Sequence, residues 1–399
     1  MTASMGGLWA GAADFAAAHP GLFDLAAAFV KTGLVMTVVM LVGGLILSWV
    51  ERKQSAIMQD RIGANRAAIL GVRAWGLVHN LADAAKGILK EDFVPPKANR
   101  FLHTLAPFVA VTTAVAAFAV LPFGGSLSVF GREVPLTVAP LQSGLLFVWA
   151  MLGIGVYGVI LAGWVSENKY GTLGALRAGA QVISYEVAAG LTILGALLVY
   201  GSLDLRQMVD WQAGHSLAGL PWVGKIPGLG GFLARIPAWG VFTQPLGFVL
   251  FFVGGIVEMK RIPFDLPEGE SEIIGYSVEY SGMKFMLFMM SEFVESLLFA
   301  WLVVLLFFGG WTLPGLLMPQ VQGADALLCG HALSYWAGGA LEAAAFVLKV
   351  AFFLWLQMLV RWSLPRFRFD QVMRLGWKIM LPTALANFAV TAAIVLLAR

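Results

Sequence analysis

Long apolar runs alternate with short charged segments along nearly the whole chain. An apolar run of about 20 residues crosses a hydrocarbon layer of roughly 30 Å as a helix. The pattern therefore predicts an all-α polytopic membrane protein, a single integral membrane domain over residues 1–399 with eight transmembrane helices. The predicted spans lie near residues 29–50, 104–122, 142–163, 178–200, 243–260, 284–309, 340–362 and 377–398.

The composition supports this interpretation and excludes other classes. Hydrophobic residues make up 59% of the chain, charged residues make up 12%, and the mean hydropathy is +0.81. Soluble domains carry about a quarter charged residues, and their cores cannot absorb this much apolar surface. A stripe of aromatic and basic residues typical of a nucleic-acid platform is absent from the sequence, so no nucleic-acid partner is expected.

The distribution of basic residues predicts an orientation. Of the 26 lysines and arginines, 19 fall in or beside residues 51–103, 164–177, 261–283 and 363–376. Because loops retained in the cytoplasm carry the excess of Lys and Arg, these four segments should face the cytoplasm and both termini should face outward. The start of the chain lacks the positive charge of a secretory signal peptide, so the first span should be retained.

A cytoplasmic surface helix is predicted after the first span. From Leu70 to Leu89 the apolar residues recur at steps of roughly three and four, between charged residues. This spacing is typical of an amphipathic helix at a membrane surface, which we place at about residues 66–90. On the outward side, the Gly- and Pro-rich segment 201–242 favours a packed loop or short helices.

The sequence gives no sign of a metal or cofactor held by this chain. Its single cysteine, Cys329, excludes a disulfide framework and a Cys-ligated iron–sulfur cluster within this chain alone. The HExxH, CxxC and Walker phosphate-loop motifs do not occur. Any redox centre must therefore belong to a partner.

Acidic residues concentrate between two apolar runs, in residues 258–285. The six are Glu258, Asp265, Glu268, Glu270, Glu272 and Glu279. If the stretch after Pro267 is largely helical, Glu268, Glu272 and Glu279 share one face, while Pro263 and Pro267 predict an ordered loop around Asp265. The cluster points to proton or cation handling beside a membrane, with a solvated loop between helices as the alternative.

Four ionisable residues fall inside predicted spans: Glu186, Glu292, Glu295 and Lys349. Each costs about 2.5 to 3.5 kcal/mol at a helix centre, so such groups face a protein interior or a water-filled path. A functional role and a purely structural, paired role are both open for each. Their number, on different spans, favours function.

At this point the chain resembles a known family, the quinone-site membrane subunit of respiratory complex I. In bacteria this is the H-type subunit of NADH:quinone oxidoreductase, and it has a mitochondrial counterpart. The likeness runs from Glu51 to Pro382 and rests on several motifs in family order. They are ERK at 51–53, MQDRIGANR at 58–66, LADAAKGILKE at 81–91, ENKYGTLGALRAGAQVISYEV at 167–187, PFDLPEGESE at 263–272, EYSGMKF at 279–285 and PRFRFDQVMRLGWKIMLP at 365–382.

The resemblance implies that the protein forms the membrane-side wall of a quinone chamber and couples quinone reduction to proton translocation. It implies an acidic path of Glu186, Glu258, Asp265, Glu268, Glu270, Glu272, Glu279 and Glu292. It implies quinone-passage residues Arg52, Arg61, Arg66, Asp83 and Lys86, with Lys90 also near the mouth. It implies docking of the soluble arm on Arg361, Arg366, Arg368 and Asp370. Arg361 and Lys349 are expected to balance negative charge.

The resemblance also implies partners and a location. Quinone is the substrate, and FMN and the iron–sulfur clusters belong to partner subunits rather than to this chain. The expected partners are the other membrane subunits, the peripheral-arm subunits and membrane lipid. The expected location is the bacterial inner (plasma) membrane, with periplasmic termini.

The chain departs from the family pattern at several positions. Ala64 replaces a proline, His79 a glutamine, and Glu167, Met259 and Lys260 depart from the motifs around them. We expect Glu167 and Lys260 to add a surface pair. Two other functions stay open: the membrane anchor of an energy-converting hydrogenase, and a stand-alone cation or proton transporter. A transporter should show a repeat with broken helices, which the sequence does not show.

Overall fold

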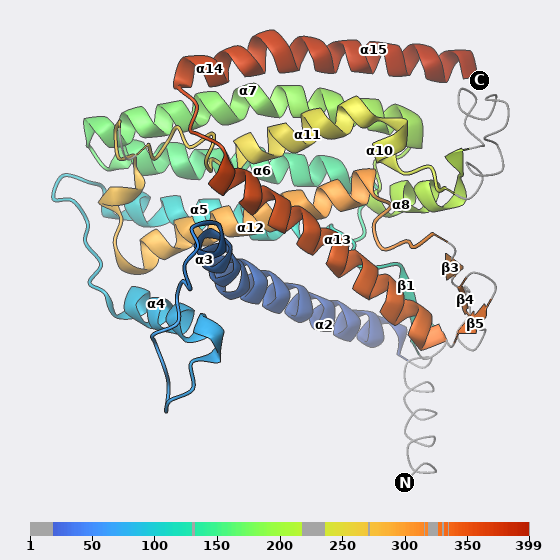
Figure 1. Ribbon diagram of the computed structural model, residues 1–399, viewed down its shortest axis with the longest axis horizontal. Coiled ribbons are helices and arrows are strands. Elements are labelled where there is room, and N and C mark those ends of the chain that lie inside the picture. The colour runs from blue at the N-terminus through green and yellow to red at the C-terminus, as the bar shows by residue number, and fades with distance from the viewer. Residues whose placement is uncertain are drawn as a thin grey trace.

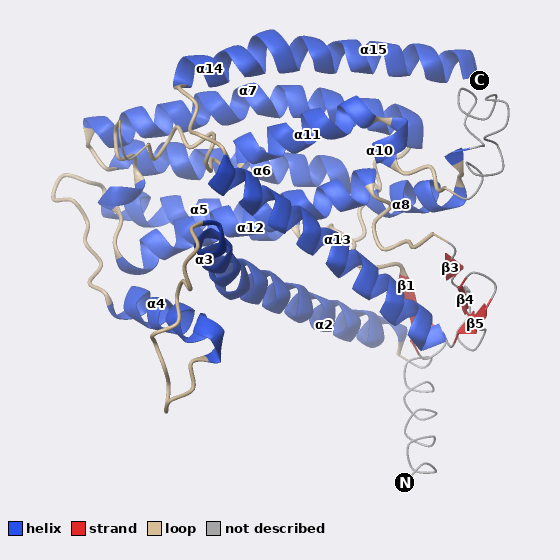
Figure 2. Ribbon diagram, viewed as in Figure 1, coloured by secondary structure: helices blue, strands red, loops and turns tan. Residues whose placement is uncertain are grey.

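The computed structural model describes residues 19–129, 132–217, 236–269, 272–314, 316–317, 326–328, 331–333 and 335–398. Helices make up nearly all of this part (Figures 1 and 2). Within the described ranges, seven helices are long and apolar enough to cross a membrane, and an eighth apolar helix is shorter. The prediction of an all-α polytopic membrane protein is confirmed.

The shorter helix is α11 (Pro245–Glu258), which corresponds to the predicted span 243–260. Its 14 residues reach about 21 Å, less than the roughly 30 Å of a hydrocarbon layer. The helix ends at Glu258, and the chain then enters the loop that carries the acidic cluster. This end of α11 therefore brings charged residues against ionisable side chains of the neighbouring helices.

The first span is longer than predicted. It comprises α2 (Pro20–Met40), a π-helical turn (Leu41–Ile46) and α3 (Leu47–Met58). The helix begins at Pro20 because proline at the first helical position has a suitable φ and needs no hydrogen-bond partner for its nitrogen. It continues past the apolar run because Glu51, just beyond that run, is buried against basic partners.

The surface helix is shorter than predicted. Helix α4 spans Leu77–Leu89 after a 3₁₀ turn at Ala74–Gly76, so the prediction of a helix over 66–90 is wrong for residues 66–76. Leu70, Gly71 and Trp75 adopt left-handed φ angles that an α-helix does not contain. The apolar residues before Leu77 therefore belong to a loop, although their spacing resembles that of a helix.

The remaining long helices begin or end a few residues outside the predicted limits. They are α5 (Arg100–Ala117), α6 (Gly144–Val165), α7 (Lys169–Tyr200), α12 (Gly282–Phe307), α13 (Tyr335–Ser363), and α14 (Phe369–Arg374) continuing through a π turn (Leu375–Met380) into α15 (Leu381–Ala398). Helix α7 starts at Lys169 because the Asn168 side chain accepts a hydrogen bond from the Tyr170 backbone. Polar capping therefore extends α7 beyond its apolar run.

Short elements occupy the ends of the bundle. Strands β1 (Ser126–Val129) and β2 (Arg132–Pro135) form an antiparallel hairpin, and β3 (Leu316–Leu317), β4 (Ala326–Leu328) and β5 (His331–Leu333) form a small antiparallel sheet. Helices α8 (Leu205–Gly214) and α10 (Gly240–Thr243) confirm the prediction of short helices in 201–242. Residues 218–235 and Cys329 lie outside the described residues.

Helix α12 lies at the centre of the bundle. Of its most apolar 18-residue window, 83% is buried inside the protein, against 17% for the first and last spans, α2–α3 and α14–α15. Figure 1 shows α15 running along α7 at one edge, and α13 crossing the bundle obliquely. Gly255 of α11 lies against the Phe299 ring of α12, so the two helices approach closely where the acidic loop begins.

Candidate functional site

The loop between α11 and α12 folds inward, and its first part is fixed by contacts with two other elements. The buried Gln181 side chain of α7 donates hydrogen bonds to the carbonyls of Val257 (2.7 Å) and Phe264 (2.9 Å). The Phe264 ring stacks on Phe367, with centroids 5.2 Å apart. These contacts hold the residues between Val257 and Phe264 against α7 and against the loop that follows α13.

Four charged side chains meet beneath this loop. Arg261 reaches Glu51 of α3 (3.4 Å) and Glu292 of α12 (3.6 Å). Arg361 of α13 forms an ion pair with the other oxygen of Glu51. The Arg261 guanidinium also lies over the Phe293 ring, 4.0 Å from its centroid. Four separate parts of the chain, α3, the loop, α12 and α13, thus contribute to one buried charge cluster.

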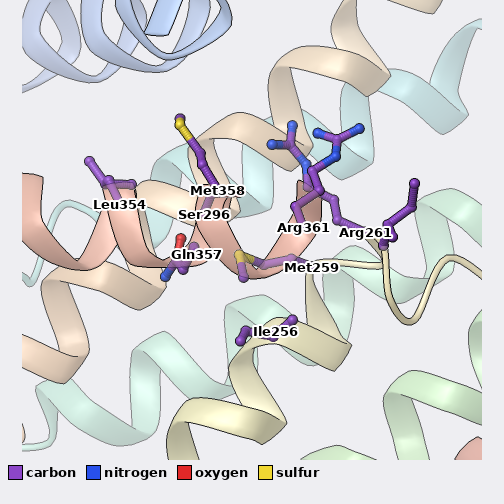
Figure 3. Close-up of a pocket in the computed structure, with 9 residues that line it drawn as sticks. Ile256, Met259, Arg261, Ser296, Leu354, Gln357, Met358 and Arg361 are labelled. Carbon is purple, nitrogen blue, oxygen red and sulfur yellow. The ribbon is translucent and has the colours of Figure 1, made fainter. Parts of the chain in front are cut away.

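A cavity of about 20 Å³ lies beside the two arginines, roughly the volume that one water needs. Figure 3 shows the guanidinium groups of Arg261 and Arg361 close together on its wall. Gln357 and Ser296 add polar atoms, and the rest of the lining is apolar. Two adjacent cations beside a small cavity with a few polar atoms suit a site that responds to added negative charge.

A second ion pair extends the cluster towards α11. Lys260 lies 3.2 Å from Glu295 of α12, with both side chains about nine-tenths buried. Glu258, at the end of α11, interacts electrostatically with Lys260, Glu295 and Glu186. The Glu186 carboxyl group of α7 lies against Gly153 of α6, where it is partly buried. Buried acids therefore continue from Glu292 to Glu186 across three helices.

Glu268 approaches the cluster from the loop. Burial raises the pKa of this carboxyl above its ordinary value. Asp265 adds to the rise, while the Ser277 hydroxyl and two arginines of the cluster oppose it. Glu268 also interacts electrostatically with Glu292. The loop thus supplies a carboxyl group that keeps its proton to a higher pH than an exposed glutamate does.

The structure brings together Glu186, Glu258, Asp265, Glu268 and Glu292 of the predicted acidic path. Two others have local partners elsewhere. Glu272, partly exposed, pairs with Arg177 (2.6 Å), and Glu279 accepts a hydrogen bond from Asn168 (2.6 Å). Glu270 lies outside the described residues.

The prediction of a helix from Pro267 onward is wrong. The described residues of this stretch form turns and a 3₁₀ turn at Ser277–Glu279, because Ile274, Gly275 and Gly282 have left-handed φ angles. Gly275 also lies too close to the Pro267 carbonyl for any larger residue. The predicted common face of Glu268, Glu272 and Glu279 therefore does not exist. The non-helical loop predicted around Asp265 is confirmed.

The residues predicted for the quinone passage lie together at the end of α3 and on α4. Arg52 pairs with Asp83 (2.5 Å) and donates to Asn80 (3.4 Å), which in turn bonds the backbone of the π turn. Arg61 donates to Gln59 (2.7 Å), and Lys86 is exposed on α4. This group is half-exposed and separate from the buried cluster.

The loop between α3 and α4 is organised by His79. Its Nε2 atom accepts hydrogen bonds from the backbone amides of Arg66 and Ala67, both at 2.9 Å. The loop exposes large apolar side chains, among them Ile62 (78%), Leu70 (100%) and Trp75 (82%). Such a surface favours contact with lipid or another subunit.

The predicted docking residues divide into two groups. Arg361 belongs to the buried cluster, whereas Arg368 and Asp370 pair on the surface (3.3 Å) with 77% and 60% of their side chains exposed. Arg366 lies against Gly269 of the acidic loop. The Phe367 amide donates to the Pro263 carbonyl (3.0 Å), so the segment after α13 is tied to that loop.

Two expectations about lysines need correction. Lys260 does not form a surface pair with Glu167, because it is buried and bound to Glu295, whereas Glu167 is exposed. Lys349 donates to three backbone carbonyls, those of Phe308, Gly310 and Thr312 (2.8 to 2.9 Å). It thus caps the end of α12 rather than joining the acidic cluster.

Sequence reasoning underrated four members of the cluster. They are Glu51, Lys260, Arg261 and Glu295. A usable signal existed: Lys260 and Arg261 follow directly on the acidic end of an apolar helix, where a membrane protein must pair them. Across the described residues, no group of three or more His, Cys, Asp or Glu side chains is placed to hold a metal ion.

The fold and the site define a class: a polytopic helical membrane protein whose buried acids and bases meet where several spans end. A sequence model of the family described as NADH dehydrogenase matches residues 30–392. The chain belongs to this family, and it is a membrane subunit of an enzyme complex, complex I. The resemblance found in the sequence is thereby confirmed.

Individual relatives agree over most of their length, and each is an H-type subunit of an NADH-quinone oxidoreductase. The chain is similar to one from Rhizobium meliloti, with 40% identity covering 90% of this chain and 95% of the relative. It is similar to one from Geobacter metallireducens, with 40% identity over 95% and 99%. It is also similar to the one from Flavobacterium johnsoniae, with 36% identity over 91% and 93%.

Proposed function

We propose that this subunit forms the membrane-side wall of the quinone-binding chamber and couples quinone reduction to proton translocation. One observation carries the proposal. Glu51 is held by Arg261 and Arg361, and Arg261 also contacts Glu292. The first span, the acidic loop, α12 and α13 thus meet at one buried charge cluster, from which further acids lead into the bundle.

The chemistry requires such an arrangement. Reduction of a quinone to a quinol takes two electrons and two protons, so negative charge develops unless protons arrive with the electrons. The electrons come from redox centres in partner subunits, and this chain supplies the acids. Glu268 and its neighbours would be the first carboxyl groups to respond electrostatically to negative charge in the chamber. Glu292, Glu258 and Glu186 would then transmit the change in protonation into the bundle of membrane spans.

The entrance for quinone is proposed between α4 and the spans. The buried Gly87 of α4 lies directly against Met286 of α12, so this surface helix is seated on the central span. Arg52 and Asp83 line the side of α4 that faces α3. Exposed apolar residues on the preceding loop give an isoprenoid tail or a partner subunit a matching surface.

The remaining assignments follow from charge. The excess of Lys and Arg in the four basic loops supports a cytoplasmic position for the acidic loop and α4, with both termini on the periplasmic side of the inner membrane. The segment with Arg366, Arg368 and Asp370 lies beside the acidic loop, which suits docking of the peripheral arm. The other membrane subunits of the complex would respond to the change in protonation at Glu186.

The proposal is tested on the complex that co-purifies with this chain. We expect NADH-driven quinone reduction that a quinone-site inhibitor blocks, together with FMN and iron–sulfur clusters in the co-purifying subunits. Hydrogen evolution without quinone reduction would instead favour the hydrogenase anchor. Purification without any redox partner would favour a stand-alone transporter, and either result would contradict the proposal.

A further inference from the structure

A second, smaller cavity lies beside Lys260, just beyond the end of α11. Its volume is about 10 Å³. The walls consist of Leu152, Val156, Val182, Glu258, Lys260 and Glu295. Its polar lining is therefore one ammonium and two carboxyl groups, enclosed by apolar side chains of α6 and α7.

The two carboxyl groups are in different states of pairing. Glu295 holds Lys260 at 3.2 Å. Glu258 is 4% exposed, and neither of its carboxyl oxygens has a hydrogen-bond partner within the part of the chain that the structure describes. Buried polar groups are as a rule hydrogen-bonded, and an ionised buried carboxylate needs a cation or several donors. Glu258 therefore requires a partner whenever it loses its proton.

Lys260 is placed to be that partner. It lines the same cavity as Glu258 and already interacts with it electrostatically. Its backbone is held by a hydrogen bond to the Val257 carbonyl (3.1 Å). Its side chain is a flexible four-carbon stem with three donor hydrogens, so the ammonium can turn without moving the backbone.

We propose that Lys260 is a mobile countercharge that moves between Glu295 and Glu258 as these carboxyl groups exchange protons. The proposal rests on the proposed function and deepens it, because it names the group whose movement makes Glu295 and Glu258 ionise alternately. It also gives a role to Lys260, one of the positions at which this chain departs from the family pattern.

One cycle moves one proton, and each O–H bond that breaks is matched by one that forms. The O–H bond of protonated Glu258 breaks, and an O–H bond forms on the Glu186 carboxylate. Lys260 then leaves Glu295 for the new carboxylate on Glu258. Glu295, having lost its countercharge, takes the proton of Glu292, whose O–H bond breaks and whose carboxylate lies beside Arg261. Transfer of this proton to Glu258 returns Lys260 to Glu295, so one proton has passed from the cluster to Glu186.

The test uses the whole complex in proteoliposomes and two designs at the pair. In Lys260→Gln with Glu295→Gln, the ammonium and its carboxylate are removed together, so no unpaired charge stays buried. In Lys260→Arg, the positive charge is kept, but the planar guanidinium is expected to stay fixed on Glu295. The matched control is Arg132→Gln, which removes a cation from a partly exposed pair with Asp24.

We expect both designs to lower the turnover of quinone reduction and proton translocation by about a hundredfold, the lower end of the effect of losing a proton-transfer group. The KM for quinone should not change, and the control should behave as the unmodified complex. Normal turnover and translocation in either design would overturn the inference and leave the proposed function intact. If the double variant fails to assemble, the result for Lys260→Arg alone decides whether the inference holds. Absence of inhibitor-sensitive quinone reduction in the unmodified complex would instead contradict the proposed function.

Discussion

The Arg261 guanidinium lies 3.4 Å from the Glu51 carboxylate, although 210 positions separate the two residues in the chain. Arg361 binds the same carboxylate from α13. Glu51 is therefore the shared anion of a buried cation, Arg261, and a partly buried one, Arg361. This relationship connects the first span to the acidic loop and to α13, and it leads to a prediction about stability.

Replacement Glu51→Gln should destabilise the protein strongly. The buried Arg261 and the partly buried Arg361 would keep their charge and lose their shared partner, and breaking a buried pair costs about 3–5 kcal/mol. The measurement is the unfolding midpoint of the purified complex in detergent. The control is Asp83→Asn, which removes a half-exposed pair worth about 0–1 kcal/mol.

The effect should be partly reversed by a second change. Adding Arg361→Gln to Glu51→Gln removes one of the two cations that have lost the Glu51 carboxylate. The unfolding midpoint should therefore rise towards that of the unmodified protein. Equal and small shifts for Glu51→Gln and Asp83→Asn would show that the buried pair contributes no more than a surface pair.

Glu268→Gln should change how stability depends on pH. Because burial raises the pKa of Glu268, the folded state binds this proton more tightly than the unfolded state does. The associated stability is present below the ordinary glutamate pKa and is lost as the pH rises through the raised value. Glutamine does not titrate, so the stability of the variant relative to the unmodified protein should increase with pH.

Unfolding midpoints between about pH 4 and pH 8 give the measurement, since this range covers ordinary and raised glutamate pKa values. Glu133→Gln, at an exposed position on β2, is the control for losing one carboxylate. A difference between Glu268→Gln and the unmodified protein that stays constant with pH would rule out a raised pKa at Glu268.

Gly87→Ala should weaken quinone binding. A Cβ at this position would overlap the Met286 sulfur, so the Met286 side chain or α4 must shift, and overpacking of this kind costs about 1–3 kcal/mol. We expect a several-fold higher KM for a long-tailed quinone, with unchanged NADH oxidation by a soluble electron acceptor.

Met286→Ala should restore the KM in the Gly87→Ala background, because it makes room for the added methyl group. Gly33→Ala is the matched control, since Gly33 has no neighbouring atom within 4 Å of the added Cβ. If Gly87→Ala binds quinone normally, the packing of α4 on α12 does not shape the entrance.

Changes at His79 should act on the order of the loop that precedes α4. Glutamine can still offer an acceptor to the amides of Arg66 and Ala67, whereas alanine cannot. Hydrogen–deuterium exchange over residues 59–73 should therefore rise in His79→Ala and stay nearly unchanged in His79→Gln. Equal exchange in the two variants would show that this histidine does not organise the loop.

The fold was predictable because length and apolarity alone identify a membrane span. All eight predicted spans correspond to helices of the structure, with α11 as the short one. The error at residues 66–76 has a physical cause. Helical spacing of apolar residues does not reveal left-handed φ angles, and Leu70 and Trp75 adopt them.

The site was predictable only in part. Glu186 and Glu292 stood out because a carboxyl group inside an apolar run is costly and needs a reason. The partners of such groups depend on how distant helices pack, so the sequence did not pair Glu51 with Arg261 or Lys260 with Glu295. The sequence also did not separate Glu272, which pairs with Arg177, from the buried acids.

Glu292→Gln removes a proton-carrying group from the buried cluster that we propose to couple quinone chemistry to proton movement. The measurement is NADH-driven quinone reduction and proton translocation, recorded together in proteoliposomes, with Glu133→Gln as the control. We expect both rates to fall together in Glu292→Gln by about tenfold or more, with the complex assembled and the control unaffected. Normal quinone reduction with normal proton translocation in Glu292→Gln would contradict the coupling role of the cluster.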